Sequence, residues 1–190
     1  SFLYQKTPVR KILNKLAGKK LLATFGGKLE FFGIGGAALD PVVEKFLREA
    51  KFPYAIGYGL TESAPLISGA NPRTVKYRAT GPVMEGIEIK INDPDPKTGE
   101  GEVWAKGDNI MKGYYKEPEL TKEVLTPDGW LKTGDLGYFD KDHFLLLKGR
   151  KKNMIVGSSG ENIYPEEIES VINNYKYVLE SIVVEKKGKL

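Results

Sequence analysis

With 190 residues, the chain is long enough for one large domain, or for one domain and part of a second. Its 29 basic and 25 acidic residues give a formal net charge of +4, and 41% hydrophobic residues are typical of a folded protein. The absence of cysteine excludes disulfides, thiolate metal sites and a cysteine nucleophile. A single histidine, His143, argues against a histidine metal cluster and against a Ser-His-Asp hydrolase.

Apolar residues near the start recur at helical spacing and predict an amphipathic helix that ends at Gly18. Residues 6–28 hold seven basic residues and no acidic one. Such a run is typical of a solvated helix face, with nucleic-acid or membrane binding as the alternative. The apolar positions are Val9, Ile12, Leu13 and Leu16.

Two apolar runs, residues 29–34 and 54–58, predict short buried strands. Between them a helix is predicted, with Asp40 as its N-cap and Pro41 at the first helical position. This order of elements favours a parallel sheet with a crossover helix. The predicted buried face of the helix consists of Val43, Phe46, Leu47 and Ala50.

In the middle of the chain the pattern changes to that of antiparallel strands. Isoleucines alternate with charged residues at 87–91, and a turn rich in Pro, Asp and Gly leads to a second strand at 102–106. Two more strands are predicted at 137–139 and 144–148, joined by a turn that contains His143. These elements predict a small antiparallel barrel or meander.

Near the end of the chain, Pro165 begins a predicted helix, because proline suits the first turn and two acidic residues follow it. Short strands are predicted at 154–156 and 181–185. The buried face of this helix is predicted to be Ile168, Val171 and Ile172.

Together the elements predict an α/β fold: a parallel sheet with crossover helices, a small antiparallel β-barrel-like region, and the start of an α+β C-terminal subdomain. Residues 1–151 are expected to form part of one large domain, with an α/β layer at about 1–82 and a β-rich region at 83–151. Residues 152–190 are expected to begin a small domain, because so short a stretch cannot complete a core.

Residues 57–63, of sequence GYGLTES, are predicted to contact a ligand as well as to form a turn. The glycines let the backbone approach a ligand closely, and Tyr58 between them offers a flat face to a base. The hydroxyl of Thr61 can donate to phosphate oxygens, and the carboxylate of Glu62 can hold Mg²⁺. The structural alternative is a strand-to-helix turn with Thr61 as its N-cap.

Two later segments also suit a nucleotide. Asp135, within the sequence GWLKTGDLG, could accept hydrogen bonds from two neighbouring ribose hydroxyls, with an Asx turn as the alternative. Arg150 is permanently charged and forked, which suits hydroxyl and phosphate groups, although a basic cluster is often only a solvated surface. A glycine-rich loop, residues 157–162, follows it.

In these segments the chain resembles the adenylate-forming enzymes and, among them, the long-chain fatty acyl-CoA ligases. The resemblance extends from about residue 29 to residue 182, and four motifs occur in the order of the family. The motifs are Gly35-Gly36-Ala37-Ala38-Leu39, Tyr58-Gly59-Leu60-Thr61-Glu62, Trp130 with Thr133-Gly134-Asp135, and Gly149-Arg150-Lys151-Lys152 with Gly160-Glu161-Asn162-Ile163-Tyr164-Pro165 and Glu167-Ile168-Glu169.

The resemblance implies a reaction in two steps. A fatty acid carboxylate attacks the α-phosphate of ATP to give an acyl adenylate and pyrophosphate, and the thiol of coenzyme A then displaces AMP. It implies that Thr61 and Glu62 are catalytic, with Thr61 contacting the phosphate and Glu62 holding Mg²⁺. It implies a nucleotide site of Gly35, Gly36, Ala37, Gly57, Tyr58, Asp135 and Arg150, in which Tyr58 stacks on adenine and Asp135 binds the ribose.

The resemblance also implies moving parts. Lys152 matches the hinge about which the family rotates its small domain between the two steps. The loop that this rotation brings toward the CoA channel would contain Ser159, Gly160 and Glu161.

Two family features have no match in the sequence: the Ser/Thr/Gly-rich phosphate loop that ends in lysine, and the essential lysine of the small domain. We therefore expect a piece of a ligase that is inactive by itself. An adenylation domain that loads an acyl carrier protein, and a non-catalytic nucleotide-binding module, are the alternatives. The expected partners are fatty acid, ATP and CoA, without nucleic acid, in the cytoplasm, with a peripheral membrane contact through residues 9–20 left open.

Overall fold

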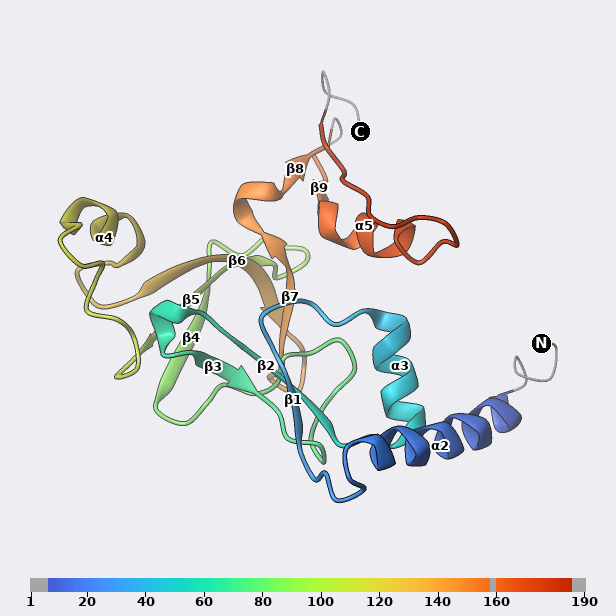
Figure 1. The fold of residues 1–190 in the computed structure, drawn as a ribbon. Helices are drawn as coiled ribbons and strands as arrows, with labels where there is room; N and C mark the ends of the chain where they lie inside the picture. The colour runs from blue at the N-terminus through green and yellow to red at the C-terminus, as the bar shows by residue number, and fades with distance from the viewer. Residues whose placement is uncertain (1–6, 158–159, 186–190) are drawn as a thin grey trace. The chain divides into compact units, whose positions relative to one another are not determined.

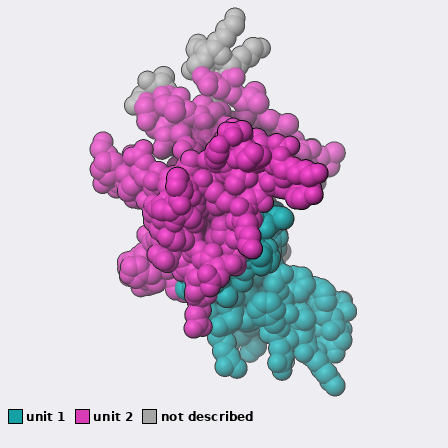
Figure 2. Space-filling view, turned by 90° about the vertical axis from the view of Figure 1, so that its left-hand side faces the viewer, with its two compact units in different colours: residues 1–84 teal, residues 85–190 magenta. Residues whose placement is uncertain are grey.

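The computed structural model describes residues 7–157 and 160–185 (Figure 1). The chain divides into two compact units, Ser1–Met84 and Glu85–Leu190, which Figure 2 colours separately. The boundary expected after residue 151 lies inside the second unit and stays a prediction.

A three-stranded sheet in the order β1-β2-β3 forms the centre of the first unit. β1 (Phe32–Ile34) and β2 (Tyr54–Gly59) run parallel, and α3 (Pro41–Ala50) makes the crossover between them (Figure 1). The predicted parallel pair with its crossover helix is therefore confirmed. β3 (Leu66–Gly69) pairs antiparallel with β2, which makes the sheet mixed.

The N-terminus of α3 forms as its sequence predicts. Oδ1 of Asp40 accepts hydrogen bonds from the backbone N–H groups of Val42 and Val43, at 2.8 and 2.9 Å, and Pro41 is the first helical residue. These bonds satisfy two of the N–H groups that every helix start leaves without a helical partner.

The predicted buried face of α3 is only partly right. Leu47 and Ala50 are buried, but Val43 is 46% exposed and Glu44 is 1% exposed in its place. The Glu44 carboxylate accepts hydrogen bonds from the Tyr54 hydroxyl (3.1 Å) and from the backbone N–H of Arg78 (3.1 Å). A buried carboxylate is tolerated where such donors replace water.

α2 (Thr7–Thr24) is a helix as predicted, but it continues past Gly18. Gly18 faces α3, where an added Cβ would lie 2.5 Å from the carbonyl oxygen of Ala50. The missing side chain thus permits close packing of the two helices. The helix is followed instead by Gly26 and Gly27, with φ of 79° and 73°.

The apolar positions of the predicted amphipathic helix are largely solvent-exposed: Ile12, Leu13 and Leu16 are 63%, 45% and 58% exposed. The first half of the helix contacts α3 through polar groups: Arg10 forms an ion pair with Glu49 at 2.8 Å, and Nδ2 of Asn14 donates to the same carboxylate at 2.7 Å. Within the described part of the chain, no helix combines the length and apolarity that crossing a membrane requires.

The core of the first unit combines aliphatic and aromatic side chains from the helices and the sheet. Leu47, Phe52 and Tyr54 are its buried members. The ring of Phe32 lies 5.5 Å from those of Phe25 and Phe52, in edge-on geometry that aromatic pairs favour.

The second unit contains an antiparallel meander in the order β4-β5-β6-β7. The prediction of a meander is confirmed, and within the described residues the sheet stays open and forms no closed barrel. A short helix, α4 (Pro118–Val124), connects the second and third strands. The strands are β4 (Ile87–Asn92), β5 (Gly101–Gly107), β6 (Leu131–Phe139) and β7 (Leu145–Arg150).

Short elements follow the meander: η2 (Lys151–Asn153), β8 (Ile155–Val156), β9 (Asn162–Ile163) and α5 (Pro165–Ile172). The predicted start of α5 at its proline is confirmed.

Two other predictions for this end of the chain are wrong. Of the three residues predicted for the buried face of α5, only Ile168 is partly buried, whereas Val171 is 60% and Ile172 is 37% exposed. Residues 181–185 form no strand in the described structure, and the backbone N–H of Val183 donates instead to Oε1 of Glu169 at 2.8 Å.

Candidate functional site

Two predicted glycine segments meet where the parallel strands of the first unit end. Gly35, Gly36 and Ala37 follow β1, and Gly57 lies on β2, one residue beyond the last β1–β2 pair. A Cβ on Gly35 would lie 3.3 Å from the carbonyl oxygen of Gly57. The carboxyl ends of parallel strands are where open α/β sheets bind ligands.

Tyr58 lies on β2, opposite Ser68 of β3, and is 8% exposed. Its stacking against a base stays a prediction. Its neighbour Gly59 has no room for a side chain, because an added Cβ would collide with the carbonyl oxygen of Pro65. The backbone at Gly59 therefore lies close to the backbone of Pro65, at the point where β2 ends and the next element begins.

That element is η1 (Thr61–Ser63), a single turn of helix. The predicted alternative of Thr61 as an N-cap is wrong, because Leu60 occupies the cap position. Ser63, which the sequence analysis did not single out, ties the turn together: its buried hydroxyl lies 2.9 Å from the Leu60 carbonyl oxygen and 2.8 Å from that of Pro65. Thr61 is exposed and Glu62 is half-buried.

In the second unit, the structure brings the two predicted nucleotide contacts together. Asp135 on β6 and Arg150 on β7 are directly opposite in the strand register. Nε of Arg150 lies 3.1 Å from Oδ1 of Asp135, and its Nη1 donates to the carbonyl oxygen of Thr133 at 3.1 Å. Asp135 is 9% exposed. A nearly buried carboxylate is thus positioned beside a permanent cation.

Lys152, the predicted hinge residue, is exposed in η2 directly after β7. Its neighbour Lys151 pairs with Glu102 of β5 at 3.0 Å. Gly160 and Glu161 lie in the turn that joins β8 and β9, where the N–H of Gly157 donates to the Glu161 carbonyl oxygen at 2.8 Å. Ser159 lies outside the described residues.

Sequence reasoning missed a polar cluster of Glu100, Lys148, Tyr164 and Glu167 in the second unit. The Tyr164 hydroxyl donates to Glu100 at 2.7 Å, and Nζ of Lys148 lies 3.4 Å from Glu100 and 3.2 Å from Glu167. Burial, followed by the bond to Glu100, raises the pKa of Tyr164. Burial alone would lower the pKa of Lys148, but its two carboxylate partners outweigh it and raise that pKa. No local pattern reveals contacts between such distant residues.

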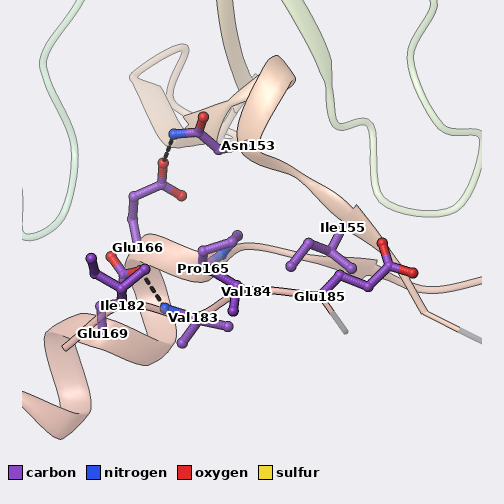
Figure 3. A pocket seen from close by; sticks show the side chains of 9 residues that line it. All are labelled: Asn153, Ile155, Pro165, Glu166, Glu169, Ile182, Val183, Val184 and Glu185. Carbon is purple, nitrogen blue, oxygen red and sulfur yellow. Dashed lines mark hydrogen bonds between the residues drawn. The ribbon is translucent and has the colours of Figure 1, made fainter. Parts of the chain in front are cut away.

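A pocket of about 390 Å³ lies beside α5 (Figure 3). The side chain of Glu166 points toward Asn153, whose Nδ2 donates to it at 2.7 Å. No residue that the sequence analysis assigned to a site is among the described residues lining it. Those residues are Asn153, Ile155, Pro165, Glu166, Glu169, Ile182, Val183, Val184 and Glu185.

Comparison with known proteins shows which family the chain belongs to. The family model described as AMP-binding enzyme matches residues 6–115. The chain is 34% identical to long-chain-fatty-acid–CoA ligase 1 of Saccharomyces cerevisiae, over 87% of this chain and 24% of the relative. It is 35% identical to a chloroplastic long-chain-fatty-acid–acyl-carrier-protein ligase of Arabidopsis thaliana, over 93% of this chain and 26% of the relative.

Solved structures give the same result. The O-succinylbenzoate coenzyme A synthetase of Bacillus subtilis, in complex with ATP and magnesium ion, superimposes with a TM-score of 0.74 and 33% identity. The match covers 90% of this chain and 39% of that one. The chain thus spans about a quarter of the length of the two curated relatives above.

Proposed function

The chain belongs to the AMP-binding enzyme family, and from this premise we propose that it is part of a ligase that adenylates a long-chain fatty acid and transfers the acyl group to coenzyme A. The two ligases for long-chain fatty acids among its relatives support this substrate class. The Asp135–Arg150 pair is the observation that carries the proposal, because a desolvated carboxylate beside a cation suits the hydroxyl groups of a ribose.

In the proposed first step, the fatty acid carboxylate displaces pyrophosphate from ATP. The segment of Gly35, Gly36 and Ala37 and the adjoining Gly57 would form the wall along which the nucleotide lies, and Tyr58 would stack on adenine. Thr61, exposed at the edge of its turn, would donate its hydroxyl to a phosphate oxygen.

Glu62 would hold a magnesium ion in this step. A half-buried carboxylate next to an exposed hydroxyl fits Mg²⁺, which takes one or two carboxylates and completes its shell with phosphate oxygens and water. The ion would neutralise charge on the leaving pyrophosphate.

In the proposed second step, the thiol of coenzyme A attacks the acyl adenylate. Lys152 would be the hinge about which the small domain rotates before this step. Ser159, Gly160 and Glu161 would lie in the loop along the thiol channel. An acyl carrier protein is the second candidate acceptor, favoured by the similarity to the Arabidopsis ligase. Thioester formation by the full-length protein with each acceptor separates the two.

A change at Asp135 tests the nucleotide site. In the full-length protein, Asp135→Ala is expected to weaken AMP binding at least about tenfold, because hydrogen bonds to a charged group contribute about 1.5–3 kcal/mol each. Isothermal titration measures this. Asp108→Ala, at an exposed aspartate of the same unit, is the control and should bind AMP like the wild type. Unchanged binding by Asp135→Ala would remove the proposed ribose contact.

We also propose that the 190 residues alone do not adenylate. Their sequence contains no Ser/Thr/Gly-rich loop ending in lysine, and the loss of one preorganised contact to a developing charge lowers a rate by about 10²–10³. Pyrophosphate exchange by this chain should therefore be undetectable, and robust exchange would refute the proposal. We further propose that the protein is located in the cytoplasm.

A further inference from the structure

The strand that carries Asp135 has a β-bulge at that point. Glu102 of β5 is opposite Leu136 of β6, and Trp104 is opposite Lys132. Between these pairs, β5 contributes Val103 alone, whereas β6 contributes residues 133–135. A bulge interrupts the ladder of strand hydrogen bonds and redirects the side chains that it carries.

The backbone of the bulge depends on Gly134, whose φ is 72°. This left-handed conformation costs a residue with a side chain free energy, and glycine adopts it freely. Gly134 separates Thr133 from Asp135 within the bulge, so contacts of these two neighbours can orient the carboxylate.

The hydroxyl of Thr133 makes the two contacts that can do so. It donates to the carbonyl oxygen of Val103 at 2.7 Å and accepts from the backbone N–H of Asp135 at 3.1 Å. Thr133 is 6% exposed, so water does not readily replace either bond. One buried hydroxyl therefore bridges the short side of the bulge and the residue on its long side.

We infer that Thr133 is a positioning residue for nucleotide recognition: its hydroxyl bridge across the bulge aims the Asp135 carboxylate at the ribose hydroxyls. The inference rests on the proposed function, because it takes Asp135 as the ribose contact. Arg150 contributes from the other side, since it contacts both the Thr133 carbonyl oxygen and the Asp135 carboxylate.

The test is discrimination between AMP and 2′,3′-dideoxy-AMP by the full-length protein. Wild type should bind AMP at least about tenfold more tightly, because only AMP offers the hydroxyls. Thr133→Val keeps the side-chain shape but lacks the hydroxyl, and it should lose most of this preference while its affinity for the dideoxy compound stays within about twofold. Thr133→Ser keeps the hydroxyl and should keep the preference.

A double-mutant cycle with Asp135→Ala adds a second measurement. Because Thr133 is inferred to act through Asp135, Thr133→Val should have no further effect on AMP binding once Asp135 is removed. Equal losses in both backgrounds would overturn the inference, as would an intact preference in Thr133→Val or a lost preference in Thr133→Ser.

Two controls keep the outcomes separable. In the first control, amide hydrogen exchange at Asp135 should accelerate in Thr133→Val while the rest of β6 stays unchanged. In the second, unfolding of the sheet in both Thr133→Val and Thr133→Ala would show that the hydroxyl stabilises the fold, and this would overturn the inference. If Asp135→Ala keeps the AMP preference, the proposed function fails. If Asp135→Ala loses it and Thr133→Val does not, only the inference fails.

Discussion

Glu44 occupies the buried position on α3 that the apolar pattern assigned to Val43. Its carboxylate accepts hydrogen bonds from the Tyr54 hydroxyl and from the backbone N–H of Arg78. Tyr54 is itself 2% exposed, and its burial, followed by the charge of Glu44, raises its pKa to about 12. Each side chain is tolerated in the core because the other is present.

Tyr54→Phe should lower the free energy of unfolding of the first unit by about 1–3 kcal/mol near pH 8, because Glu44 loses a buried donor. A raised tyrosine pKa favours the folded state below pH 10, and this stabilisation is lost as the pH rises toward 12. The difference between wild type and variant should therefore shrink over that range. Urea titrations at several pH values measure it, and a constant difference would contradict the assignment.

The residue scale also shows what a sequence can reveal about a site. Asp135 and Arg150 were each predicted as nucleotide contacts from their own chemistry, and the structure shows in addition that they pair with one another. Their pairing follows from the register of β6 against β7, which no local pattern encodes. Ser63 was missed because a buried serine in a turn looks the same in sequence as an exposed one.

Among the elements, α3 was predicted well at its start because its signals are local: an N-cap aspartate followed by proline. α2 was predicted as an amphipathic helix, but its apolar residues Ile12, Leu13 and Leu16 are exposed. Its contact with α3 includes Gly18, Asn14 and Arg10, a small residue and two polar ones. The choice of face depends on a partner far along the chain.

α5 joins the meander through polar side chains, since Lys148 contacts both Glu100 and Glu167 while Val171 and Ile172 stay exposed. Lys148→Met should therefore loosen α5 without disturbing β4–β7. Hydrogen exchange should accelerate at residues 165–172 and stay unchanged in the sheet.

The matched control for that variant is Lys122→Met. Lys122 also pairs with a glutamate, Glu119 at 2.8 Å, but both side chains are more than 70% exposed. Exposed pairs contribute little to stability, so exchange should not change anywhere in α5. Equal exchange of α5 in Lys148→Met and wild type would show that the cluster does not fasten the helix.

At the scale of the whole molecule, the exposed face of α2 is the candidate for contact with a lipid surface. Ile12, Leu13 and Leu16 lie among lysines, the combination that binds anionic interfaces. Lys11→Glu with Lys15→Glu should weaken binding of the full-length protein to anionic vesicles at least about tenfold in sedimentation. Lys97→Glu with Lys141→Glu changes the net charge equally and should have little effect on vesicle binding. If the wild-type protein does not bind anionic vesicles, the proposed lipid contact is refuted.

The bond between Tyr164 and Glu100 joins residues 64 positions apart. Since a ribosome releases the chain from its N-terminal end, the acceptor in the hairpin of β4 and β5 emerges well before the donor is synthesised. A nascent chain can thus form its β4–β7 meander first, and the segment that carries Tyr164 then packs against a sheet that has already formed.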